Sequence, residues 1–228
     1  MKFRIVGNVV PAVEVFFERP GEEMITQSGG MAWMSDGISM TTDTNGGALA
    51  GFGRMFAGES IFMAHYKATK AGATIAFATT VPGKVVPIKM KDHPNGLICQ
   101  KGAFLCSQPT VKLDIEFTKK FSAGLFGGEG FILEKLTGDG AAFLEVDGDI
   151  VEKNLAPGEI IKIDTGNVVA FQNGMSYEIE TVHGFKNVLF GGEGLFLTRI
   201  TGPGKVILQT QNIKDFAKSI SNILPNRN

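Results

Sequence analysis

Short apolar runs alternate with turn residues along most of the chain. Runs such as 160–163 and 168–171 are bounded by Gly or by polar residues, and Pro-Gly or Pro-Asn-Gly separates neighbouring runs at 20–21, 94–96 and 157–158. Pro presets φ for a turn, and Gly and Asn tolerate positive φ. Short apolar runs between such turns are typical of β-strands. The pattern therefore predicts an all-β fold of short antiparallel strands.

The last part of the chain changes to a helical period. Its apolar residues recur three, four and seven positions apart: Ile213, Phe216, Ala217, Ile220, Ile223 and Leu224. Asn212 is suited to the N-cap, with Asp215 three residues later, and Pro225 ends the pattern. We expect one amphipathic helix of about three turns. Its apolar face should close an open edge of the core; the alternative is that it lies on a membrane or a partner.

An eight-residue motif divides the chain into three similar parts. Residues 126–133 (FGGEGFIL) recur as 190–197 (FGGEGLFL) and, more weakly, as 56–63 (FAGESIFM). A glycine precedes each motif glutamate by 29, 27 and 27 residues, and another follows it by 13, 11 and 11. These landmarks predict three tandem small β-sandwich or barrel-like repeats that share one core. We place them at 1–83, 84–148 and 149–212, followed by the helix and tail at 213–228.

Composition and charge exclude several classes of protein. The 30 Gly and 18 Phe disfavour a mostly helical chain, and 22 basic against 23 acidic residues leave a net charge of −1. The charge therefore disfavours a nucleic-acid partner, because phosphate binding needs a basic surface. No apolar run approaches the roughly 18 residues of a membrane span. We expect Cys99 and Cys106 to be reduced and the protein to be cytoplasmic.

The sequence offers no assembled catalytic or metal site. Its three histidines lack metal-ligand spacing, and no Gly-x-Ser-x-Gly nucleophile motif occurs. We therefore expect no catalytic residues, no metal and no cofactor. The repeated Glu59, Glu129 and Glu193 are interpreted as part of hairpins or bulges. The alternative is that these three carboxylates form a cation or ligand site around a pseudo-threefold axis. The glycines expected to shape the turns are Gly58, Gly128, Gly130, Gly192 and Gly194.

Several of these motifs, in this order, resemble one family. They are GMAWM at 30–34, GESIF at 58–62, PG at 82–83, GAFL at 102–105, the two FGGEG copies and TGPGKV at 201–206. The chain resembles the family of mitochondrial altered-inheritance protein 24, formerly domain of unknown function 124, over nearly its whole length. The resemblance implies three tandem copies of the fold of the tryptophan RNA-binding attenuation protein, of the double-stranded β-helix type. It also implies a homotrimer, and in eukaryotes a link to mitochondrial inner-membrane organisation.

Taken together, these features favour a non-enzymatic protein. We expect a homo-oligomeric β scaffold or binding protein, whose partners are further copies of itself and a peripheral membrane or protein surface. The alternative is a ring that binds RNA or a small ligand in clefts between its sheets.

Overall fold

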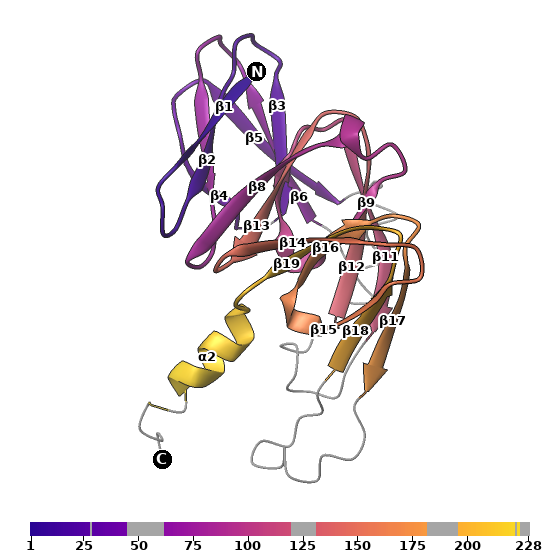
Figure 1. Cartoon of the computed structure of the whole chain (residues 1–228). Helices are drawn as coiled ribbons and strands as arrows, with labels where there is room; N and C mark the ends of the chain where they lie inside the picture. Colours follow the sequence, from indigo (N-terminus) through magenta and orange to yellow (C-terminus); the bar gives the residue numbers. More distant parts are fainter. Residues whose placement is uncertain (28, 45–61, 120–130, 182–195, 222, 224–228) are drawn as a thin grey trace. The chain divides into compact units, whose positions relative to one another are not determined.

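The computed structural model describes residues 1–27, 29–44, 62–119, 131–181, 196–221 and 223 (Figure 1). The described chain consists of antiparallel strands and one α-helix, α2 (Ile213–Ser221), near the C-terminus. Both the all-β prediction and the predicted helix are therefore confirmed. Single 3-10 turns lie at Met90–Asp92, Lys101–Ala103 and Thr165–Asn167.

The chain divides into two compact units. Unit 1 comprises Met1–Pro94, Gly102–Lys112 and Thr137–Glu145, and unit 2 comprises Asn95–Lys101, Leu113–Leu136 and Val146–Asn228. Residues of the second predicted segment, 84–148, thus belong to both units. The repeat boundaries concern the sequence and stay a prediction.

Unit 1 is built around two sheets. The first has the order β1-β2-β7-β4 and the second the order β5-β6-β3-β10-β13-β8. The strands of the first are β1 (Lys2–Val6), β2 (Ala12–Phe16), β7 (Thr74–Ala78) and β4 (Met31–Met34). Those of the second are β5 (Ile38–Thr44), β6 (Phe62–Ala68), β3 (Glu23–Gln27), β10 (Phe104–Ser107), β13 (Ala141–Asp147) and β8 (Gly83–Lys89).

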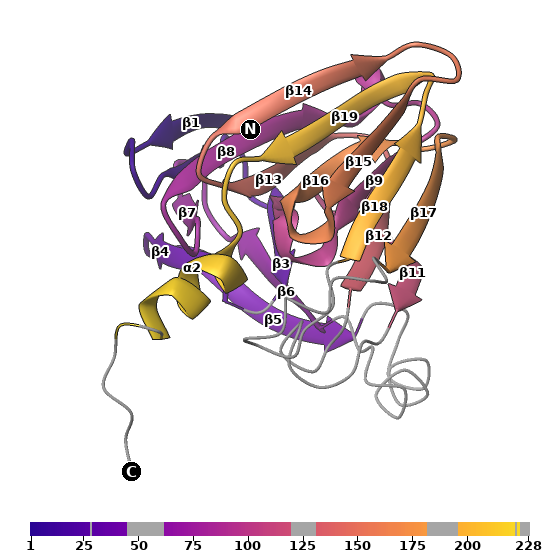
Figure 2. The same ribbon diagram turned by 60° about the horizontal axis from the view of Figure 1, so that its bottom comes forward.

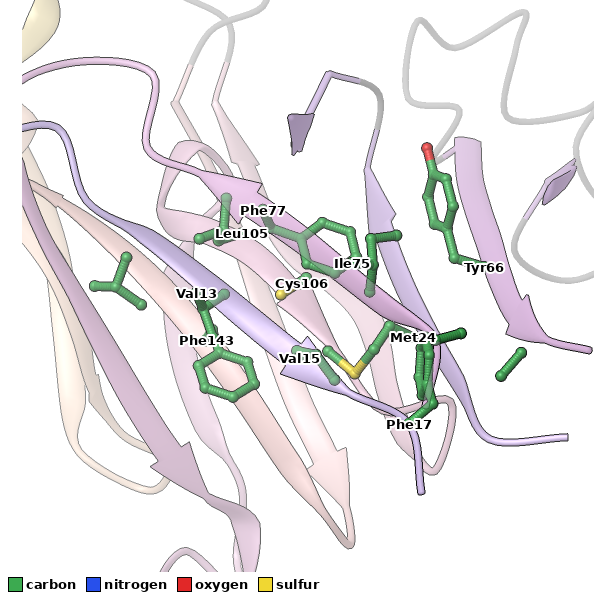
Figure 3. Close-up of a cluster of buried hydrophobic side chains, with 13 residues drawn as sticks. Val13, Val15, Phe17, Met24, Tyr66, Ile75, Phe77, Leu105, Cys106 and Phe143 are labelled. Atoms are coloured by element: carbon green, nitrogen blue, oxygen red, sulfur yellow. The ribbon is translucent and has the colours of Figure 1, made fainter. Parts of the chain in front are cut away.

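The residue pattern of strand β2 shows how a strand of unit 1 turns one face to the core. Val13 and Val15 are fully buried. Glu14, which lies between them, forms an ion pair with Arg4 of β1 at 2.6 Å. Successive strand residues face opposite sides of a sheet, so one face of β2 enters the core. Figure 3 shows side chains of this core, among them Met24 and Phe17. Aromatic and aliphatic burial of this kind is the main stabilising term of the unit.

Unit 2 also contains two sheets, with the orders β11-β12-β9-β16-β19-β14 and β15-β18-β17. Figure 2 shows β19 beside β14, and β18 between β15 and β17. The strands of the larger sheet are β11 (Val111–Lys119), β12 (Phe131–Gly138), β9 (Leu97–Gln100), β16 (Val168–Gln172), β19 (Gly204–Gln209) and β14 (Ile150–Leu155). The smaller sheet has β15 (Ile160–Asp164), β18 (Phe196–Thr201) and β17 (Ser176–Thr181). Leu133, Phe171 and Ile200 lie in the core of this unit.

Candidate functional site

The site residues predicted from the sequence lie outside the described part of the chain. This holds for the three repeated glutamates Glu59, Glu129 and Glu193, and for the turn glycines Gly58, Gly128, Gly130, Gly192 and Gly194. The cation or ligand site therefore stays a prediction. Within the described ranges, no three His, Cys, Asp or Glu side chains come together in a group that could hold a metal ion.

One described pair of titratable side chains joins two neighbouring strands of unit 1. His65 of β6 lies with its Nδ1 2.6 Å from Oε1 of Glu23 on the neighbouring β3. His65 is a partly buried strand residue. The two residues are 42 positions apart in the sequence, so their contact depends on the pairing of β3 with β6.

Both cysteines are buried free thiols. Burial raises the pKa of each thiol well above its ordinary value, and for Cys99 the nearby Glu134 carboxyl raises it further. Glu134 is fully buried on β12, directly opposite Cys99 of β9. Sequence reasoning missed Glu134, because a glutamate within an apolar run ordinarily faces solvent. A neutral, buried thiol is a poor nucleophile, so neither cysteine offers reactive chemistry.

Strands β4 and β15 lie at sheet edges and have exposed apolar side chains. Strand β4 pairs with β7 on one side, and strand β15 pairs with β18 on one side; among the described residues neither has a strand on its other side. Trp33 and Met34 of β4 are 47% and 40% exposed, and Ile160 of β15 is also exposed. An edge strand presents unpaired N–H and C=O groups that can pair with another chain.

The backbone of β4 shows which groups face the open side. The N–H of Ser35, just after β4, donates to the carbonyl oxygen of Thr74 at 2.8 Å. Because successive N–H groups of a strand point to opposite sides, the N–H of Met34 points away from β7. Among the described residues, the open edge of β4 therefore offers an unpaired donor at Met34.

Charge distinguishes β4 from another edge strand of its sheet. Natural edge strands are commonly protected from pairing by charged side chains. Strand β1 has this protection: Lys2 and Arg4 lie on it, and Arg4 binds Glu14. Strand β4, with the sequence MAWM, has no charged residue. An exposed, apolar, uncharged edge is typical of a strand that pairs with a partner.

A shared irregularity relates β4 to two other strands. Strands β4, β10 and β16 each contain a register shift, at Met31/Trp33, Phe104/Cys106 and Val168/Ala170, where they pair with β7, β13 and β19. Strands β10 and β16 are paired on both sides, because β10 also contacts β3 and β16 also contacts β9. Of these three strands, β4 alone has one side open within the described chain. Sequence reasoning missed this feature, since a bulge leaves no residue signature here.

Comparison with known proteins assigns the family. The family described as Mitochondrial biogenesis AIM24 matches residues 3–211. The chain belongs to the AIM24 family. An uncharacterised protein of Streptococcus pyogenes serotype M6 is 28% identical over 233 residues, which cover 99% of this chain and 92% of that protein. The crystal structure of another Streptococcus pyogenes protein superposes with a TM-score of 0.77 at 26% identity, covering 98% of this chain and 99% of that one.

In this AIM24-family chain the C-terminal helix begins as predicted. The N–H of Asp215 donates to Oδ1 of Asn212 at 2.9 Å, and the N–H of Ile213 donates to Oδ2 of Asp147 at 2.8 Å. These contacts satisfy two of the free N–H groups at the helix start.

The expected burial of the helix is not observed. The apolar side chains of Phe216 and Ile220 are 39% and 43% exposed, so α2 does not close a core edge in the described chain. No helix among the described residues is long and apolar enough to cross a membrane.

Proposed function

We propose that this AIM24-family protein is a non-enzymatic β scaffold that assembles from copies of itself. The observation that carries the proposal is the open edge of β4. It is apolar, uncharged and exposed, whereas the two strands that share its bulge are paired on both sides. Pairing with another copy would give β4 the second neighbour that β10 and β16 already have.

The strand order supports three structural repeats in the scaffold. Strands β2–β7, β8–β13 and β14–β19 are three sets of six in chain order. In each set the first, sixth and third strands are neighbours, as in β2-β7-β4, β8-β13-β10 and β14-β19-β16. The second, fifth and fourth strands are also neighbours, as in β3-β6-β5, β9-β12-β11 and β15-β18-β17. A six-stranded module repeated three times explains both of these strand orders.

The assembly we propose is a homotrimer, so that three chains of three modules form one unit of nine modules. This number follows the resemblance to the attenuation-protein fold. Closed symmetry is the usual outcome for soluble homo-oligomers. The buried, neutral thiols support a role without covalent catalysis. We also propose a cytoplasmic location, because free thiols persist in reducing compartments.

The mass of the purified protein in solution tests the scaffold. Size-exclusion chromatography with light scattering should give about 73 kDa, three times the chain mass of 24.4 kDa. A monomer at micromolar concentration would refute the assembly. A dimer or larger species would retain self-assembly and refute the trimer.

A second candidate role rests on α2 and is binding to a membrane surface. An amphipathic helix with an exposed apolar face can lie in the plane of a lipid interface. Phe216 and Ile220 are the exposed apolar side chains at its centre. The wild-type protein should co-sediment with anionic lipid vesicles, and the Phe216→Ser/Ile220→Ser variant should stay in the supernatant. Equal binding of both proteins, or no binding by either, would refute this role.

A further inference from the structure

We infer that β4 of one copy pairs antiparallel with β15 of the next copy, with Met34 opposite Lys162. The inference rests on the proposed self-assembly and adds the two surfaces and their register. Its basis is that the equivalent pairing already occurs twice within the chain, between β10 and β3 and between β16 and β9.

The equivalent positions on β4, β10 and β16 follow from the shared bulge. Immediately after the bulge, two consecutive residues of each strand return to regular register with the neighbouring strand. The second of these two residues is Met34 in β4, Ser107 in β10 and Phe171 in β16. Ser107 and Phe171 are buried, whereas Met34 is exposed.

The equivalent positions on β3, β9 and β15 follow from their partners. His65, Lys135 and Arg199 each lie six residues after a repeated glutamate of the sequence motif. Their direct partners across the sheet are Ile25 of β3, Ile98 of β9 and Lys162 of β15. Ile25, Ile98 and Lys162 therefore occupy the same position of their modules.

The two internal junctions use the same pair of positions. Ser107 lies opposite Ile25 where β10 joins β3, and Phe171 lies opposite Ile98 where β16 joins β9. Applied to the two open strands, this register places Met34 opposite Lys162. The neighbouring pair of Ala170 and Cys99 in the second junction places Trp33 opposite Ile163 in the same way.

The side chains of the two edges can be accommodated in this pairing. Trp33, the single Trp of the chain, is exposed and would gain a covered position next to Ile163. The ammonium of Lys162 already has a partner, Glu180, at 2.7 Å, so its aliphatic stem can lie beside Met34 without loss of the ion pair. The contact joins two different surfaces, so each copy has one of each to offer and the chain of contacts can close into a ring.

Cross-linking between copies tests the register. The N–H of Met34 points toward the partner, which makes Met34 and Lys162 a hydrogen-bonded pair with Cα atoms about 5.5 Å apart. A thiol cross-linker that spans about one strand spacing, ~5 Å, suits this distance. The variant Met34→Cys/Lys162→Cys should lose its monomer band on a denaturing gel. The matched out-of-register variant Met34→Cys/Ile160→Cys should stay mostly monomeric, because diagonal pairs are about 7–8 Å apart.

Two further controls separate the outcomes. The wild-type protein should give no cross-link, since Cys99 and Cys106 are buried. The single variant Met34→Cys should also give none; a cross-linked dimer there would show β4 paired with β4 and overturn the inference. An assembly of the expected mass that cross-links equally at both registers, or at neither, overturns the β4–β15 pairing and leaves the scaffold intact. A monomeric wild-type protein overturns both.

Discussion

Met34 and Ser35 are neighbours whose N–H groups point to opposite sides of β4, so proline at each position tests a different contact. Met34→Pro removes the donor on the open edge, which bonds to nothing within the described copy. Proline is tolerated on edge strands where its missing N–H faces outward. The fold of each copy should therefore survive this substitution, while the contact between copies should weaken.

The loss at the interface can be estimated from the hydrogen bond alone. A net hydrogen bond contributes about 1 kcal/mol, and the carbonyl left without a donor costs about 1–3 kcal/mol more. The sum of about 2–4 kcal/mol per interface corresponds to an increase of about 30- to 700-fold in the dissociation constant. A dilution series followed by light scattering measures this increase, and emission of Trp33 should shift to longer wavelength as the edge becomes exposed to water.

Two matched variants complete the test. Ser35→Pro removes two hydrogen bonds within the copy, from the Ser35 N–H to the Thr74 carbonyl at 2.8 Å and from the Thr74 N–H to the Ser35 Oγ at 2.9 Å. It should lower the free energy of unfolding by about 2–4 kcal/mol. Met34→Ala keeps the backbone donor and should assemble more tightly than Met34→Pro. Equal dissociation constants for wild type and Met34→Pro would refute the assigned direction of the Met34 N–H and its role between copies.

Three further predictions test the fold and the proposed junction. Gly138→Ala should destabilise the protein more than Gly72→Ala in urea unfolding. Both glycines have positive φ, which costs another residue about 1–2 kcal/mol, but only at Gly138 would the added Cβ meet the Thr110 carbonyl oxygen. Burial raises the pKa of Asp147 above its ordinary value of 3.8, so the charged carboxylate opposes folding. Asp147→Asn should therefore be more stable than wild type at pH 7. The difference in stability should vanish as the pH falls below 3.8, where the carboxyl group is protonated in both the folded and the unfolded chain. Lys162→Ile should tighten assembly, and weaker assembly would argue against the β4–β15 contact.

Local chemistry explains why part of this structure was predictable. The turns at Gly21 and Gly158 have positive φ, as expected from the Pro-Gly pairs. The helix start at Asn212 follows from a side chain that caps its own following turn. Such features depend on residues a few positions apart, and the sequence displays them directly.

Other features depend on contacts between distant segments, and the sequence did not display them. The pairing of His65 with Glu23 and the burial of Glu134 arise only once β6 lies beside β3 and β12 beside β9. The exposed apolar face of α2 could not be predicted either, because an amphipathic pattern describes two faces and not what covers them. The open side of β4 depends on strand order, which hydrophobic periodicity does not specify.

One position now connects the sequence repeat with the proposed assembly. Ile25 and Ile98 occupy the two junctions within the chain, and the third module has Lys162 at the same place. An isoleucine on an open edge would promote non-specific pairing during synthesis and folding, whereas a lysine opposes it and can still pack through its stem. The permanent junctions can therefore have an apolar residue at this position, while the junction formed after folding has a charged one there. This difference is what the three modules should show if two junctions are internal and the third joins separate copies.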